Sequence, residues 1–288
     1  MLRLFTDTSA NLPAALLLRH YITVIPFSYT VNGREMLYPE DTDFDGAEFY
    51  GAMRAGAQVR TSMVSPDTAA RYFEQALAQG DDVLYVGMSG GISGTAQAAA
   101  MAAVELMDRY PDRQLMTIDT YAASLGEGLL VLEAAEMAQA GKSGADIVAH
   151  VESLIPSVRA SFVVDTLTFL HRGGRCSGAA ALAGSVLKLH PKIIVKDGKM
   201  SVDKKYRGSL AHAISTYTAD LHDDLLAADK KRVFITHSGC DREIVEQVRT
   251  YLTALHHFDE VIETRAGGVI SCHCGPGTLG VLFVESAK

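Results

Sequence analysis

The chain has 288 residues, which is enough for two domains of ordinary size or one large one. Apolar residues make up 48% of it and charged residues 21%, the composition of a globular protein with a buried core. The net charge of -8 argues against a nucleic-acid surface, because such domains usually carry an excess of Lys and Arg. No apolar run reaches the roughly eighteen residues of a membrane span, so we expect no stable membrane insertion.

The N-terminal segment and the cysteines indicate a cellular compartment. Asp7 follows a short apolar run and no small-residue cleavage site comes after it, so we expect no signal peptide. The four cysteines are too few and too unevenly spaced for a disulfide framework. We therefore expect a cytoplasmic protein with reduced thiols.

The first half of the chain alternates strand and helix patterns. Strands are expected at Leu2–Thr6, Thr23–Val31, Glu35–Tyr38, Val83–Val86 and Leu115–Asp119. Helices are expected after Pro13 with Asn11 as a cap, from Ser65 to about Gln79, from Ser93 to about Tyr110, and over Ala122–Ala140. Asn32-Gly33 is a strong hairpin signal. Apolar strands that alternate with long helices are typical of a parallel sheet.

After about Val158 hairpins mix with helices. Strands are expected at Ser161–Val164, at Lys192–Lys196 and Lys199–Asp203 around an Asp197-Gly198 turn, at Arg232–His237, and near Val261, Val269 and Val281. Helices are expected at Thr166–Arg172, Ala179–Leu189, Ser209–Leu226 and Arg242–His256. The sequence thus predicts an α/β protein, with a parallel-sheet N-terminal domain over residues 1–160 and a smaller α+β C-terminal domain over residues 161–288.

Two segments of the first half combine hydroxyls and glycines where loops should meet. Residues 61–66 read Thr-Ser-Met-Val-Ser-Pro and lead into a helix, whose free N–H groups together with hydroxyls can hold an anion. The simpler interpretation is an ordinary N-cap by Ser65. Residues 87–95 form a Gly-rich turn after a buried strand, where α/β sheets place ligands, and Ser93 can both cap the next helix and face the cleft.

Two segments of the second half add basic groups. In residues 165–177, Arg172 and Arg175 bracket a double glycine and can bind an anionic group or pair with Asp165. In residues 267–280, His273 precedes a Gly-Pro-Gly turn and can donate to a carboxylate, although a lone histidine is more often a core residue.

These segments, with Thr6–Pro13 and Gly268–Phe283, resemble the signature blocks of the DegV family, in the family's order and across nearly the whole chain. The resemblance implies a non-enzymatic protein without catalytic residues or cofactor, which buries one fatty acid such as palmitate, stearate or oleate between two domains. It implies that Thr61, Ser93 and His273 bind the carboxylate, with Ser62 and Gly94 beside them.

The resemblance also implies a partner. Members of the family serve a separate fatty acid kinase, which phosphorylates the bound carboxylate to an acyl phosphate for phospholipid synthesis. Residues 204–207 (Lys-Lys-Tyr-Arg) resemble a basic stretch of the family, so Arg207, with Arg172 and Arg175, is a candidate phosphate or partner contact; taken alone, the stretch is a solvated charge run. The sequence departs from the family at Cys272 and Cys274, where a small residue or Thr is common.

Other classes of function compete with this one. Gly87-Met88-Ser89-Gly90-Gly91 matches Gly-x-Ser-x-Gly, so a serine hydrolase using Ser89 with Asp165 and His273 is the main alternative. It is disfavoured because two glycines and Ile92 separate the serine from the expected helix. A zinc site at residues 272–274 with His237 and Cys240 is disfavoured because neighbours on an expected strand point to opposite faces. A dinucleotide-binding enzyme is disfavoured as well. The turn after the first strand reads Thr6-Asp7-Thr8-Ser9, whereas such enzymes have Gly-x-Gly-x-x-Gly there.

Overall fold

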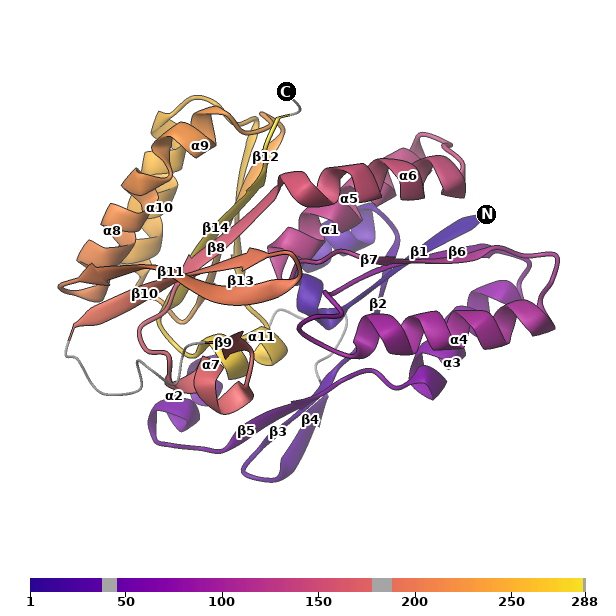
Figure 1. Cartoon of the computed structure of the whole chain (residues 1–288), viewed down its shortest axis with the longest axis horizontal. Coiled ribbons are helices and arrows are strands. Elements are labelled where there is room, and N and C mark those ends of the chain that lie inside the picture. Colours follow the sequence, from indigo (N-terminus) through magenta and orange to yellow (C-terminus); the bar gives the residue numbers. More distant parts are fainter. Residues whose placement is uncertain (38–45, 178–187, 287–288) are drawn as a thin grey trace.

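A computed structural model describes residues 1–37, 46–177 and 188–286. They form three β-sheets with helices packed around and between them (Figure 1), and the predicted α/β class is confirmed. None of the described helices is long and apolar enough to cross a membrane.

The first sheet is parallel and has the strand order β2-β1-β6-β7. Its strands are β1 (Leu2–Asp7), β2 (Ile22–Ile25), β6 (Asp82–Gly87) and β7 (Leu115–Asp119). The helices of this region are η1 (Thr8–Ala10), α1 (Ala14–Arg19), α3 (Pro66–Leu77), α4 (Thr95–Arg109), α5 (Leu125–Gln139) and α6 (Gly144–Leu154). In Figure 1, α3 and α4 lie on one side of this sheet and α5 and α6 on the other. Sequential strands joined by helices give the parallel arrangement.

A small antiparallel sheet inserts between β2 and β6. It contains β3 (Ser28–Val31), β4 (Arg34–Leu37) and β5 (Val59–Ser62), with α2 (Ala47–Arg54) preceding β5. The predicted hairpin at Asn32-Gly33 joins β3 to β4, and both turn residues have positive φ (49° and 81°), as a type I′ turn requires. The predicted strand end at Tyr38 lies outside the described residues.

The third sheet is mixed and has the order β13-β12-β14-β8-β10-β11-β9. Its strands are β8 (Val158–Val163), β9 (Cys176–Ser177), β10 (Leu189–Lys196), β11 (Lys199–Arg207), β12 (Arg232–Ser238), β13 (Glu260–Arg265) and β14 (Thr278–Val284). The helices of this region are η2 (Ile155–Ser157), α7 (Thr168–Gly173), α8 (Leu210–Asp220), α9 (His222–Leu226), α10 (Arg242–Ala254) and α11 (Gly268–Cys274). In Figure 1, α8, α9 and α10 cover one face of this sheet.

Helix α5 joins the two large sheets. It contacts β1 and β6 of the parallel sheet and β8 and β14 of the mixed sheet. Ten of its fifteen residues are buried, so it is enclosed on nearly all sides, as expected of a helix that is apolar all round. The two regions therefore share one core rather than meeting at a polar boundary.

Several sequence predictions differ from the structure. The segment Thr23–Val31, expected as one strand, is divided between β2 and β3 of two different sheets. Val269 lies in α11 and not in a strand. The expected helix at Ser209–Leu226 is two helices that meet at Leu221; the hydroxyls of Thr216 and Thr218 donate to carbonyls four residues back, an arrangement that bends helices. Most of the expected helix at 179–189 lies outside the described residues, and Leu189 starts β10.

Candidate functional site

Three elements distant in sequence bring Thr61, Ser93 and His273 to one cavity. Thr61 lies on β5, Ser93 in the turn before α4, and His273 in the last turn of α11. The Thr61 Oγ1 and His273 Nε2 atoms are 2.9 Å apart, a hydrogen bond. We call this space the polar cavity; it is lined by Phe27, Thr61, Met63, Met88, Ile92, Ser93, Arg175, Met200, Val269, Ile270, His273 and Cys274.

Local hydrogen bonds fix the two hydroxyl residues. Thr61 pairs with Tyr29 of β3 in the antiparallel sheet. Ser93 Oγ accepts the N–H of Thr95 at 3.3 Å, whereas the N-cap position of α4 is Gly94, so the helix begins two residues later than predicted. The hydroxyl of Thr95 accepts the N–H of Val64 at 3.2 Å and thereby joins the two loops.

Ser62 and Gly94 are placed differently from their neighbours. Both are exposed, and neither lines the polar cavity. Ser62 follows Thr61 on a strand, so its side chain points to the opposite face. A Cβ at Gly94 would lie 2.9 Å from Met63 Sδ, which shows that glycine lets the methionine pack over the turn.

His273 is an uncharged group at neutral pH. Burial, with a smaller contribution from the nearby Arg175 guanidinium, lowers its pKa from 6.5 to about 4. Its Nδ1 is buried and has no hydrogen-bond partner among the described residues. A Cβ at Gly173 would lie 2.2 Å from Nδ1, so only glycine leaves room for the ring. A neutral imidazole donates one hydrogen bond, and the positive charge of the cavity comes from Arg175.

The three candidate arginines lie in different places. Arg175 lines the polar cavity and donates to the Gly173 carbonyl at 2.5 Å. Arg172 is exposed, with its guanidinium 6.0 Å from the centre of the Phe169 ring. Arg207 is exposed at the far end of β11, seven positions from Met200 and thus roughly 20 Å along the strand. The structure groups Arg175 alone with the carboxylate candidates.

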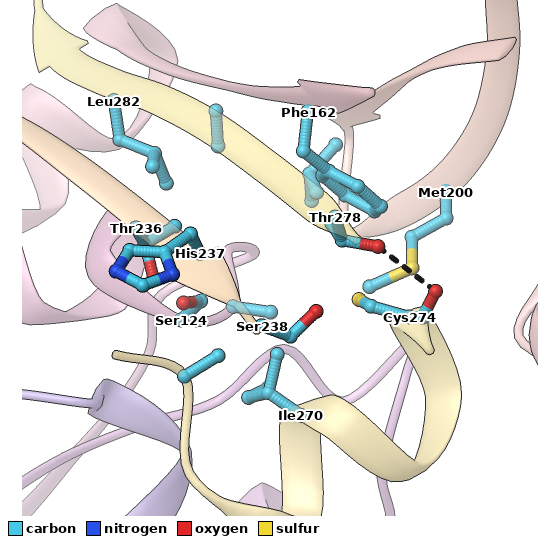
Figure 2. A pocket seen from close by; sticks show the side chains of 14 residues that line it. Ser124, Phe162, Met200, Thr236, His237, Ser238, Ile270, Cys274, Thr278 and Leu282 are labelled. Carbon is cyan, nitrogen blue, oxygen red and sulfur yellow. Dashed lines mark hydrogen bonds between the residues drawn. The ribbon is translucent and has the colours of Figure 1, made fainter. Parts of the chain in front are cut away.

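An apolar cavity adjoins the polar one. It is lined by Ala123, Ser124, Ala160, Phe162, Val195, Met200, Thr236, His237, Ser238, Ala266, Ile270, Cys274, Thr278 and Leu282, several of which are drawn in Figure 2. Met200, Ile270 and Cys274 line both cavities, so these three side chains separate them. Each cavity has a volume of about 40 Å³, room for a few water molecules. A longer ligand would have to move the flexible Met200 side chain.

The two neighbouring cavities differ in the groups that they offer to a ligand. Two hydroxyls, a neutral imidazole and one guanidinium line one, and mainly aliphatic and aromatic carbon the other. Such a combination suits an amphipathic ligand with an anionic head. The polar groups can bind and orient a carboxylate.

The cysteines of the last signature block are on a helix, which corrects the strand expected there. The β-branched run at Val269-Ile270 favours a strand locally, but Gly267 caps a helix that packs against α7, β3 and β5. Burial raises the thiol pKa of Cys272 and of Cys274 to about 12, so both remain protonated. Across residues 1–37, 46–177 and 188–286, no group of three metal-ligating side chains is found.

The hydrolase residues do not meet. Ser89 is fully buried, and its hydroxyl donates to the Gly198 carbonyl at 2.8 Å and accepts the N–H of Gly91. Asp165 lies 3.4 Å from His190 Nδ1, whereas His273 bonds to Thr61. A nucleophile needs its base within hydrogen-bond reach, and in the described part of the chain no hydrogen bond joins Ser89, Asp165 and His273.

The family model for DegV, described as "Uncharacterised protein, DegV family", matches residues 1–286 of the chain. The chain belongs to the DegV family. A DegV domain-containing protein of Clostridium perfringens is 32% identical over 286 residues, covering 99% of this chain and 98% of the relative.

Solved DegV structures share the whole fold. A DegV family protein from Thermus thermophilus, described with fatty acid binding, superposes with a TM-score of 0.88 at 33% identity and 99% coverage of both chains. DegV from Bacillus subtilis, described as a fatty acid binding protein, gives a TM-score of 0.85 at 27% identity and 99% coverage of both chains. The α/β architecture of this chain is therefore the DegV architecture.

Sequence reasoning missed residues that complete the site. Met200 lines both cavities, and it comes two residues after the predicted Asp197-Gly198 turn. The turn was recognisable, but nothing in the sequence showed which loop it would contact. Asn11, expected as a helix cap, instead accepts the N–H of Gly267 and donates to Ser124 Oγ, both at 2.9 Å.

Proposed function

We propose that this DegV protein binds one long-chain fatty acid, with the carboxylate at Thr61, Ser93 and His273 and the tail in the apolar cavity. The observation that supports it most directly is the pair of adjoining cavities, polar at one end and apolar at the other. Fatty acid binding by the Thermus thermophilus and Bacillus subtilis proteins of the same fold points the same way.

The energetics favour a tight complex. Burying a chain of about sixteen carbons at about 0.8 kcal/mol per methylene gives on the order of 12 kcal/mol, before ordering and desolvation are subtracted. Head-group contacts then need to supply orientation more than affinity. Two hydroxyls, a neutral imidazole and Arg175 provide this, and such a set leaves the carboxylate available for reaction.

We propose further that the protein is non-catalytic and cytoplasmic and presents the carboxylate to a fatty acid kinase for phospholipid synthesis. In this proposal residues 1–160 and 161–288 are the two domains. The boundary falls within β8, which is the first strand of the mixed sheet in chain order. Arg207 and Arg172 are exposed and lie apart from the carboxylate residues, as suits contacts with a partner. Arg175 lies in the polar cavity, where it would meet the carboxylate and the incoming phosphoryl group.

The binding proposal is tested by removing the head-group contacts. We expect Ser93→Ala and His273→Ala to weaken retention of radiolabelled palmitate by about fivefold each, since each removes about 1 kcal/mol of hydrogen bonding. Ser153→Ala and His222→Ala, at exposed positions on α6 and α9, are the matched controls. Unchanged retention in both site variants, with circular dichroism intact, would contradict the assignment.

The partner proposal has its own test. Purified protein loaded with palmitate is mixed with a bacterial fatty acid kinase and Mg-ATP, and the rate of acyl phosphate formation is measured. We expect Arg207→Gln to slow the reaction at least tenfold without releasing palmitate, because a rim charge acts on association with the partner. Lys230→Gln, an exposed charge before β12, is the control. Equal rates for the two variants would argue against Arg207 as a contact.

A further inference from the structure

Two buried carboxyl groups lie outside both cavities. Asp7 ends β1 and Glu127 lies in the first turn of α5; their exposed fractions are 1% and 0%. The Ser9 hydroxyl oxygen is 2.5 Å from Asp7 Oδ1 and 2.6 Å from Glu127 Oε2. Within the described residues, no Lys, Arg or His forms an ion pair with either carboxyl.

Counting protons at this cluster shows that one carboxyl is neutral. A serine hydroxyl has one hydrogen and can donate to only one of its two carboxyl neighbours. If both carboxyls were ionised, one of the two short contacts of Ser9 Oγ would join two oxygen atoms with no hydrogen between them. The second contact therefore requires a proton on one carboxyl, which donates to Ser9 Oγ.

The hydrogen-bond partners show which carboxyl carries the proton. Asp7 accepts four donors: the N–H and hydroxyl of Ser9, the Tyr85 hydroxyl at 2.7 Å and the Met88 N–H at 3.4 Å. A carboxylate with several donors is stabilised as the anion. Glu127 has one further donor, the Thr6 hydroxyl, on Oε1 at 3.1 Å. The proton thus lies on Glu127 Oε2.

We propose that Glu127 is held as a neutral acid and that, through Ser9 and Asp7, it positions the two segments that carry Ser93 and His273. This positioning role rests on the proposed fatty acid function. Asp7 accepts the N–H of Met88, which begins the turn leading to Ser93. The chain then passes through η1 to Asn11, whose side chain accepts the N–H of Gly267 at the start of α11.

The groups that face this cluster are all acids. They are Asp7 of β1, Tyr85 of β6, Asp119 of β7 and Glu127 itself on α5. Burial raises the pKa of Glu127 well above its usual 4.5, and the charge of Asp7 raises it further. Because the folded pKa is raised, the stabilisation is fully present below pH 4.5 and is lost as the pH rises through the folded value. Ionised Glu127 would repel Asp7 and release the Met88 turn.

The protonation state is tested by infrared spectroscopy in D2O at neutral pH. We expect a protonated-carboxyl carbonyl band in the wild-type protein that disappears in Glu127→Gln, since the amide donates to Ser9 without a titrating proton. Glu133→Gln, which removes a partly buried carboxylate of the same helix that pairs with Lys231, is the matched control and should keep the band. A wild-type protein without the band, or a band that survives in Glu127→Gln, overturns the proposal.

The positioning role is tested by the pH profile of palmitate retention. At neutral pH, Glu127→Gln should release palmitate at the same rate as the wild type. Above neutral pH, the release rate should increase for the wild type and for Glu133→Gln but not for Glu127→Gln. Identical profiles for wild type and Glu127→Gln overturn the role. If the wild type retains no fatty acid at any pH, the proposed function fails and the role with it, while the infrared band still decides the state of Glu127.

Discussion

At the scale of single residues, the proposed head-group site depends on a histidine that is kept uncharged. Imidazolium would bind a carboxylate more strongly than imidazole does, but a stronger ion pair would also stabilise the fatty acid against the proposed phosphoryl transfer. Desolvation by α11 and its neighbours and the positive charge of Arg175 both favour the neutral ring. Arg175 then supplies the only charge among the described residues that line the polar cavity.

The lowered pKa of His273 predicts a loss of stability in mild acid. Its pKa falls from 6.5 in the unfolded chain to about 4 in the folded one, so folding opposes protonation. The contribution is present above pH 6.5 and is lost as the pH falls towards 4; the difference corresponds to about 3 kcal/mol. Denaturant unfolding at pH 7 and pH 5 should show a smaller change for His273→Ala than for the wild type. An imidazole NMR resonance that titrates near 6.5 would contradict the prediction.

At the scale of elements, the turn between β10 and β11 packs on the Gly-rich turn after β6. Ser89 Oγ donates to the Gly198 carbonyl at 2.8 Å, and a Cβ at Gly91 would lie 2.4 Å from that same oxygen. The contact joins two walls of the polar cavity, because Met200 follows one turn and Ser93 the other. Ser89, considered as a nucleophile from its motif, is a contact between the two sheet regions.

Adding a methyl group at this contact should weaken the packing around the polar cavity. Gly91→Ala is expected to push the two turns apart, to destabilise the fold by about 1–3 kcal/mol, as overpacking does, and to speed fatty acid dissociation. Gly51→Ala is the control: its Cβ would meet nothing within 4 Å on α2, so it should stabilise by up to about 1 kcal/mol. Thermal unfolding and palmitate off-rates measure both. A Gly91→Ala protein as stable and as retentive as the wild type would show that this contact is unimportant.

At the scale of the whole molecule, sequence periodicity predicts much of the fold. β7 was predicted with its observed bounds, and both type I′ hairpin turns were recognised because Asn-Gly and Asp-Gly supply positive φ. The predictions that fail lie where contacts between distant parts of the chain determine the secondary structure. Val269 favours a strand by itself, but a helix forms instead, and Asn11, 256 residues away, accepts the N–H of Gly267 at its start.

The site was predictable only in part for the same reason. Hydroxyl and glycine clusters predict an anion site, and the structure brings Thr61, Ser93 and His273 together. The pairing of Glu127 with Asp7 through Ser9 leaves no trace in either local pattern, since Glu127 is 118 or more positions from the other two residues. Likewise, the apolar cavity combines the residues just before α5 with residues of β8, β12 and α11, which no sequence window contains.

The central claim, that this protein carries one fatty acid, is tested most directly by mass spectrometry. The protein is purified from a bacterial host and measured under native conditions, then denatured and extracted with solvent. The account predicts one C14 to C18 fatty acid per chain, bound in the native spectrum and released on denaturation. A bare protein that also fails to take up added palmitate or oleate would contradict it.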